Sequence, residues 1–393
     1  MNSLQTPQYF FQIGTTTDIA LAEAKTVVSR FGFGTIDAVN KQIALLDATR
    51  ELKQDELNLL QNTLGGTIKI AQVFAVRDEM LAGKILEKQL AEYLQDETVH
   101  RFTIAEFNRE NVPVVDAAEI KSLLHLAGKR MNYVEAGRYG ANAAQLKRAT
   151  SELWVVHFAD QQYFAWTRTV QNIDEWSFRD IGKPVRERKR GMLPPKIARM
   201  MLNLAIGDGQ PEDQVVLDPF VGTGTVLIEA TMLGVPQIQG SDIDPQAIYS
   251  STANLTWWKE QSEIEFETKL VRREVAHLVK GDFMPPPTMI VTEPFLGKLT
   301  PSPEQIPNVV RGLEKLYKGA IKAFTQLLPE GGMVAIILPT FIVRERHIAM
   351  DRTVADFTRA GFELLHGPFI VGHPDAVTQR TVYVLKYIPY GSR

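Results

Sequence analysis

The second half of the chain alternates strand-like and helical segments at short intervals, and this pattern constrains the fold most. We expect helices at 197–205, 225–233 and 245–258, with strands at 214–217 and 237–240 between them. Strands and helices that alternate in this way form a parallel sheet covered on both faces. The sequence therefore predicts a doubly wound α/β domain over residues 197–393, completed by a fifth strand at 331–338 and a hairpin formed by 362–366 and 380–386.

The first 172 residues mix strand-like and helical segments without this regular alternation, and they predict an α+β region. In a first domain, 1–75, we expect strands at 8–13, 43–46 and 67–76 and helices at 18–30 and 51–64. In a second domain, 76–172, we expect helices at 79–94 and 117–127, a strand at 99–107, and a hairpin of 152–158 with 163–170. Residues 173–196 are predicted to be a basic linker, since 180–196 are rich in Arg, Lys, Gly and Pro.

The connection after the strand at 214–217 carries the clearest chemical signal. Asp218 ends the strand, Gly222 and Gly224 form a tight turn, and a helix begins near Thr225. Such a turn alone is an ordinary strand–helix connection, but Asp242 follows the next strand at about the 20-residue spacing of a ribose-binding carboxylate. The third glycine of a dinucleotide site is missing, and Asp218 would repel a pyrophosphate but attract a cationic amino-acid group. The turn therefore favours S-adenosylmethionine over NAD.

Two later segments extend this site. Asp282 can accept a hydrogen bond from an adenine amino group while Phe283 packs on the ring. Residues 292–295 follow a fourth buried strand, where polar groups would face the reactive atom of the cofactor.

The segments DPFVGTGT, GSDID, GDF and TEPF resemble, in this order, motifs I to IV of class I methyltransferases that act on exocyclic amino groups. Together with RGMLPPKIARMMLNLA and the hairpin ELWVVHF…YFAWTRTV, they resemble the THUMP-containing tRNA guanine-N2 methyltransferase family. The resemblance implies a Rossmann-like class I methyltransferase domain with a mostly parallel seven-stranded sheet, preceded by a ferredoxin-like and THUMP-like region. The expected cofactor-binding residues are Asp218, Phe220, Gly222, Gly224, Thr225, Asp242, Ile243, Asp282 and Phe283.

The fourth motif departs from the D-P-P-Y or N-P-P-Y usual in the family. The lone pair of a base amino group is delocalised into the ring, so acceptors must draw on its N–H bonds while an aromatic side chain stacks on the flipped base. Either Thr292 or Glu293 could take the acceptor position, and Phe295 can stack without a tyrosine hydroxyl. The candidate catalytic residues are Thr292, Glu293, Pro294 and Phe295.

Charge is segregated along the chain although the net charge is only −3. Residues 183–199 hold seven basic residues against one acidic residue, and 121–148 hold six against one, so the rest of the chain is acidic. Local basic runs are the electrostatic footprint of nucleic-acid binders, and we expect tRNA or another structured RNA as partner. The candidate RNA-binding residues are Lys129, Arg130, Arg186, Arg188, Lys189 and Arg190.

Composition excludes several chemistries. The chain has no cysteine, which excludes disulfides, thiolate metal sites and a cysteine nucleophile such as pyrimidine C5 methylation needs. Its seven histidines show no ligand spacing, so no metal is expected. No signal peptide or membrane span is expected, which favours a soluble, cytoplasmic protein with no membrane partner.

The leading hypothesis is methyl transfer from S-adenosylmethionine to the exocyclic N2 of a guanosine, most simply in tRNA. An adenine-N6 methyltransferase acting on DNA or RNA is an alternative, because the same geometry serves any exocyclic amine. A non-catalytic RNA-binding protein that keeps the cofactor fold is another, since Glu293 replaces the usual Asp or Asn. A nicotinamide dehydrogenase is the weakest, given the missing third glycine.

Overall fold

A computed structural model describes residues 6–78, 80–107, 115–137, 139–146, 150–187, 192–298, 300–343, 346–372 and 375–389. The chain forms two compact units, and its first half contributes to both. Unit 1 comprises Met1–Thr17, Phe31–Asn62 and Thr67–Ile173, and unit 2 comprises Asp18–Arg30, Thr63–Gly66 and Asp174–Arg393. None of the described helices is long and apolar enough to cross a membrane.

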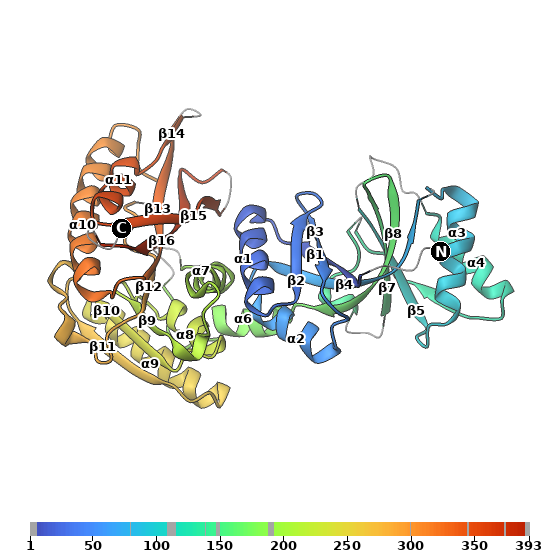
Figure 1. Cartoon of the computed structure of the whole chain (residues 1–393), viewed down its shortest axis with the longest axis horizontal. Helices are drawn as coiled ribbons and strands as arrows, with labels where there is room; N and C mark the ends of the chain where they lie inside the picture. The colour runs from blue at the N-terminus through green and yellow to red at the C-terminus, as the bar shows by residue number, and fades with distance from the viewer. Residues whose placement is uncertain are drawn as a thin grey trace. The chain divides into compact units, whose positions relative to one another are not determined.

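Unit 1 is built on one sheet with the described strand order β2-β3-β1-β4-β8-β7-β5-β6 (Figure 1). The strands are β1 (Gln8–Ile13), β2 (Gly34–Ala38), β3 (Ile43–Ala48), β4 (Thr67–Arg77), β5 (Arg101–Phe107), β6 (Asn132–Tyr133), β7 (Thr150–Phe158) and β8 (Gln161–Val170). The helices of this unit are α2 (Gln54–Thr63), α3 (Gly83–Gln95), α4 (Ala117–Leu126) and α5 (Ala143–Leu146). Because β4 pairs with β8, the segments predicted as domains 1–75 and 76–172 share a continuous sheet.

The predicted hairpin of unit 1 is present as β7 and β8, which pair antiparallel. Its turn residues Ala159 and Asp160 both have positive φ, the conformation that matches the right-handed twist of the flanking strands. Apolar residues of α3 and α4 pack with residues of β5, β7 and β8 into one hydrophobic cluster, so these helices cover one face of that end of the sheet.

Unit 2 is the expected doubly wound domain, with strand order β11-β10-β9-β12-β13-β16-β15 (Figure 1). The strands are β9 (Val215–Asp218), β10 (Gln237–Asp242), β11 (Glu267–Arg272), β12 (Met289–Thr292), β13 (Met333–Val343), β14 (Arg346–Ile348), β15 (Phe362–Val371) and β16 (Thr378–Tyr387). The first five on this path are parallel, and β16 is antiparallel to both β13 and β15. The short β14 pairs with β13, so the described sheet has eight strands where seven were predicted.

The helices of unit 2 are α1 (Thr17–Arg30), α6 (Ile173–Ile181), α7 (Pro195–Ile206), α8 (Thr225–Met232), α9 (Pro245–Ser262), α10 (Ile306–Leu327) and α11 (Asp351–Arg359). The last five of these, α7 to α11, pack against its sheet (Figure 1). Residues of α10 and α11 form a buried cluster with β9, β12 and β13, while α7 packs with α8. Chain order runs outward in opposite directions from the boundary between β9 and β12, to β10 and β11 on one side and to β13 on the other. Ligands bind at such a point in sheets of this kind.

Two segments from the first half of the chain are held in unit 2 by a buried carboxylate. Glu23 of α1 accepts hydrogen bonds from the backbone N–H groups of Gly65 and Gly66, each at 2.8 Å, and from the Asn203 side chain of α7 at 2.7 Å. A Cβ atom on Gly66 would lie 2.3 Å from the Cβ of Ala20, so only glycine permits this approach.

Several described elements were not predicted from the sequence, among them β11, α10 and α11 of unit 2. Elements β2 and α6 are two further cases. Residues 34–38, for which no element was expected, form β2, an edge strand paired only with β3 in the described sheet. Residues 173–181, predicted as part of a linker, form helix α6, whose one buried residue is Arg179. Residues 34–38 are too few to show a clear pattern, and α6 buries an arginine rather than an apolar stripe.

Candidate active site

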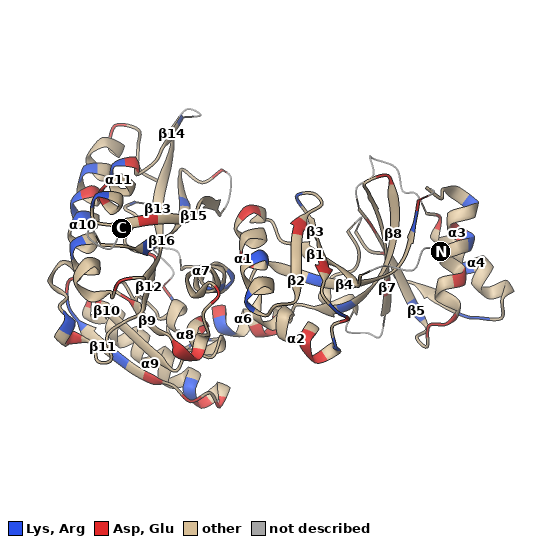
Figure 2. Ribbon diagram, in the orientation of Figure 1, with Lys and Arg blue, Asp and Glu red and all other residues tan. Residues whose placement is uncertain are grey.

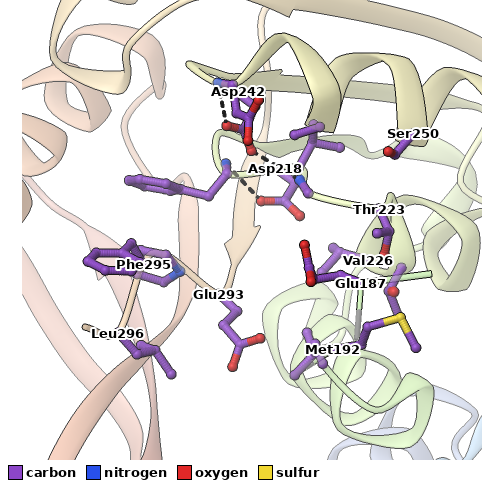
Figure 3. A pocket seen from close by; sticks show the side chains of 18 of the residues that line it. Glu187, Met192, Asp218, Thr223, Val226, Asp242, Ser250, Glu293, Phe295 and Leu296 are labelled. Carbon is purple, nitrogen blue, oxygen red and sulfur yellow. Dashed lines mark hydrogen bonds between the residues drawn. The ribbon is translucent and has the colours of Figure 1, made fainter. Parts of the chain in front are cut away.

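A cavity of about 1170 Å³ lies at the carboxyl ends of three adjacent parallel strands of unit 2. Asp218 ends β9, Asp242 ends β10, and Glu293 follows β12. Strand β9 pairs with both β10 and β12, so these three side chains converge on the cavity although 75 residues separate the first from the last. Figure 3 shows the three carboxylates around the same space.

Asp218 is buried at the floor of this arrangement. Its Oδ1 accepts hydrogen bonds from the Thr292 hydroxyl at 2.6 Å and from the backbone N–H of Phe220 at 3.1 Å. Burial raises the pKa of Asp218 to about 7, helped by the nearby negative charges of Asp242 and Glu293. A cationic ligand in the cavity would favour the ionised form of this group.

Asp242 links the second strand end to the glycine turn. Its Oδ2 accepts from the backbone N–H of Gly222 at 3.2 Å, and its Oδ1 accepts from that of Asp244 at 3.0 Å. Gly222 and Gly224 have φ of 50° and 81°, a backbone conformation that favours glycine, so the two predicted glycines are needed for the turn itself. Asp242, Gly222 and Ile243 line the cavity, and Gly224 is not among its lining residues.

Lys183 supports the glycine turn from behind, a role that sequence reasoning missed. Its ammonium group donates to the hydroxyls of Thr225 at 2.8 Å and Thr223 at 3.2 Å. The side chain is buried, and burial lowers the pKa of Lys183 to about 8, while the charges of Asp180 and Glu229 oppose the shift. Lys183 was counted in the basic run as an exposed charge, and burial removes it from any RNA-contacting surface.

The two alternatives for the fourth motif are distinguished by side-chain direction. Thr292 is fully buried, bonded to Asp218, and is not among the lining residues. Glu293 lines the cavity, and its Oε1 accepts from Arg380 Nε at 2.5 Å. Arg380, from β16, also lines the cavity and was not predicted. The structure therefore directs the Glu293 carboxylate, rather than the Thr292 hydroxyl, into the cavity.

The rest of the motif forms a turn fixed by α10. The Tyr317 hydroxyl donates to the backbone carbonyl of Phe295 at 2.8 Å. Pro294 and Phe295 both line the cavity, and the Phe295 side chain is 56% exposed, which leaves a ring face open to a flat ligand.

These features match a known family over the segment that contains them. Residues 184–360 match the family model described as UPF0020, RMKL-like, methyltransferase domain. Over this segment the chain carries a methyltransferase domain similar to that family. The domain is 31% identical over 152 residues to the tRNA (guanine(10)-N2)-dimethyltransferase of Methanothermobacter thermautotrophicus, a match that covers 39% of this chain and 40% of the relative. The chain thus aligns with less than half of that relative's length.

Solved structures share the fold over nearly the whole chain. TrmN from Thermus thermophilus has a TM-score of 0.55 at 19% identity, covering 97% of this chain and 100% of that one. SMU.472, solved in complex with SAH, has a TM-score of 0.51 at 11% identity, covering 99% of this chain and 100% of that one. At these identities the likeness shows a shared fold and nothing finer.

Two residues predicted to bind adenine lie elsewhere in the methyltransferase domain. Phe283 is fully buried in the hydrophobic core, so a packing role takes the place of the predicted stacking role. Asp282 lies in a 3-10 turn, Lys280–Asp282, and forms an ion pair with Arg273 at 2.7 Å. Neither residue lines the cavity, whereas Ile243, 62% exposed, does.

The predicted basic runs prove to be only partly exposed. Arg186 is exposed and lines the cavity, while Arg188, Lys189 and Arg190 lie outside the described residues. In unit 1, Arg130 is exposed, and Lys129 donates its ammonium to the backbone carbonyls of Gln95 and Glu97. Figure 2 shows Lys and Arg spread over many elements beyond the two runs.

Arg199, which belongs to the basic run 183–199, is fully buried within an ion-pair cluster. Glu229 of α8 accepts from Arg199 of α7 at 2.5 Å and from Arg179 of α6 at 2.7 Å. Both guanidinium groups lie over the ring of Trp176, at 5.2 and 4.5 Å from its centroid. Since α8 begins at the glycine turn, this cluster anchors the helix that carries part of the site.

Proposed function

We propose that the protein transfers a methyl group from S-adenosylmethionine to the exocyclic N2 of a guanosine in tRNA. The observation that carries the proposal is that one cavity combines a glycine turn with two strand-end aspartates and, opposite them, a carboxylate beside an open aromatic ring. The relative in Methanothermobacter, named for guanine-N2 dimethylation of tRNA, supports the choice of substrate.

The chemistry of the lining residues fits the cofactor. Among the described residues, Asp218 has a hydroxyl and an amide as partners but no cation, and a sulfonium or ammonium group would supply one. Asp242, at the end of the second strand, is placed to accept from ribose hydroxyls, and the exposed Ile243 offers an apolar surface to a purine.

The other side of the cavity fits an amine substrate. S-adenosylmethionine supplies an electrophilic methyl group when bound. Glu293 can accept an N–H of the base amine and thereby restore electron density to its nitrogen, while Phe295 stacks on the ring. As the bond from the amine nitrogen to the methyl carbon forms, the bond from that carbon to sulfur would break, and the amine would lose one proton. Glu293 Oε2, which has no donor among the described residues, can receive this proton.

We further propose that residues 76–172 form a THUMP-like RNA-binding domain. The exposed Arg130 and the half-exposed rings of Tyr133 and Tyr139 support this role, because guanidinium groups and aromatic rings are the usual contacts for phosphates and unpaired bases.

Two measurements test the proposal. Calorimetry should show S-adenosylmethionine binding by the whole chain, with strong loss for Asp242→Ala and none for Asp213→Ala, an exposed aspartate that precedes the amino end of β9 and does not line the cavity. Labelled cofactor should then be incubated separately with bulk tRNA, rRNA and DNA, followed by digestion to nucleosides. Label in N2-methylguanosine from tRNA supports the proposal, and label in N6-methyladenosine contradicts it. RNA binding without any transfer would favour the non-catalytic alternative.

A further inference from the structure

The ion pair between Glu293 and Arg380 gives the cavity an ordered set of hydrogen-bonding groups. Arg380 Nε donates to Glu293 Oε1, which leaves the N–H groups of Nη1 and Nη2 without a further partner among the described residues. Glu293 Oε2 is also without a donor there, and both side chains line the cavity. In order along the pair, the groups are a donor, which is an N–H of Arg380, and two acceptors, which are Oε1 and Oε2 of Glu293.

We propose that Glu293 and Arg380 together read the Watson–Crick edge of guanine. This inference rests on the proposed function and explains how the site distinguishes its base. The edge of guanine presents O6 as acceptor, then N1–H and the N2 amine as donors. The pair presents the complementary order, which is also the order that cytosine presents in a base pair.

Adenine does not fit the same groups. Its edge presents the N6 amine as donor and N1 as acceptor, so an ionised carboxylate that accepts from N6 sets its second oxygen against the N1 lone pair. A neutral amide or a protonated carboxyl group, which offers one donor and one acceptor, would suit adenine better. A glutamate at this position therefore suits guanine better than an asparagine would.

Arg380 has a second effect, because Glu293 must be ionised to act in this way. Burial raises the pKa of Glu293, and the charge of Arg380 opposes the shift. Asp218, whose charge is of the same sign, and the buried Tyr317, which stays neutral because its own pKa is raised, are its titratable neighbours. The other charged residues that line the cavity are Arg186, Glu187, Asp242, Asp244 and Lys298. Arg380 is the cation that is bonded to Glu293 and lowers its pKa, so its loss should favour the neutral form.

The test uses the full chain, bulk tRNA and labelled S-adenosylmethionine across a range of pH. The variants are Arg380→Gln, Arg380→Lys and Glu293→Gln, with Arg359→Gln, an exposed arginine of α11, as control. We expect Arg380→Gln to lower transfer to guanine about tenfold, the size of one lost specific base contact, and to move the acid limb of the rate profile to higher pH. Arg380→Lys keeps the charge and should restore the position of that limb.

Glu293→Gln should lose transfer to guanine and raise the share of label found in N6-methyladenosine, with cofactor affinity kept. The inference is overturned if Arg380→Gln keeps the wild-type acid limb, or if Glu293→Gln keeps the wild-type rate and base ratio. These results leave the proposed function standing, because the wild type would still methylate guanine. A wild type that binds the cofactor but never methylates guanine would overturn both. If Arg380→Gln does not fold, the two remaining variants decide.

Discussion

The hydroxyl of Thr292 donates to the carboxylate of Asp218 across 2.6 Å and so joins two neighbouring strand ends inside the core of the methyltransferase domain. Thr292 is thus turned into the core, while the next side chain, Glu293, enters the cavity. The two adjacent residues therefore have separate positions, one bonded to a strand-end aspartate and the other lining the cavity.

Replacing Thr292 by Val should weaken cofactor binding without unfolding the protein. The change keeps the shape of the side chain but removes the hydrogen bond that lowers the pKa of Asp218, so more of this carboxyl group is protonated at neutral pH. We expect the dissociation constant of S-adenosylmethionine to rise by up to about tenfold near pH 7. Calorimetry measures it. Thr340→Val, which removes a buried hydroxyl of β13 bonded to Thr381, is the matched control and should bind normally.

Cofactor binding should also become tighter as the pH rises from about 6 to about 8. The pKa of Asp218 is about 7, mainly through burial, so the group is protonated below this pH and must release its proton to pair with a cation. The affinity should fall by up to about tenfold for each pH unit below 7. Calorimetry in buffers of different ionisation enthalpy would detect the released proton. Asp218→Asn should bind weakly at every pH, and a wild-type affinity independent of pH would contradict the assignment.

The sequence predicted the alternating strands and helices over 197–258 and the three acidic strand ends, because both follow from local apolar runs and from their order along the chain. It did not predict β11, α10 or α11. It could not find Arg380, which is 87 residues from Glu293 and reaches it only because β16 inserts beside β13. It misread Phe283, since the preceding segment is a 3-10 turn that directs the ring into the core rather than a strand that ends at the site.

Charge was the least reliable guide, for a physical reason. A count of charged residues along the sequence cannot distinguish a solvated cation from a buried one, and Lys183 and Arg199 are both buried. Helix α6 was hidden for a related reason, because its buried contact is an arginine rather than an apolar stripe.

Replacing Lys183 by Met should loosen the glycine turn. The change removes two hydrogen bonds, to Thr223 and Thr225, but also removes a buried charge, so the free energy of unfolding should change little. We expect about tenfold weaker S-adenosylmethionine binding by calorimetry. Lys318→Met, at an exposed position of α10, should bind like the wild type. Equal affinity in both variants would show that the turn holds its shape without the lysine.

Replacing Glu229 by Gln should destabilise unit 2 strongly. Arg179 and Arg199 would remain buried beside a neutral amide, and removing one partner of a buried ion pair costs about 3–5 kcal/mol. Urea denaturation followed by circular dichroism gives the free energy of unfolding. Glu212→Gln, on the surface, should change it by less than about 0.5 kcal/mol. A small effect at Glu229 would mean that the ring of Trp176 and water compensate the two cations.

Glu23 should stabilise unit 2 by joining the Gly65–Gly66 turn to α1 and α7. In Glu23→Ala the two backbone N–H groups and the Asn203 amide lose their acceptor, and the free energy of unfolding should fall on the order of 3 kcal/mol. Lys25→Ala, exposed on the same helix, is the control.

The pH dependence of stability gives a second readout for Glu23. Burial raises its folded-state pKa to about 7, so the unfolded chain loses this proton first as the pH rises. The wild type should therefore lose stability between about pH 4.5 and 7, and Glu23→Gln should lose the part of this slope that Glu23 contributes. Denaturation curves at several pH values measure both slopes. An unchanged slope in Glu23→Gln would show that Glu23 is already ionised in the folded protein and that its three donors outweigh its burial.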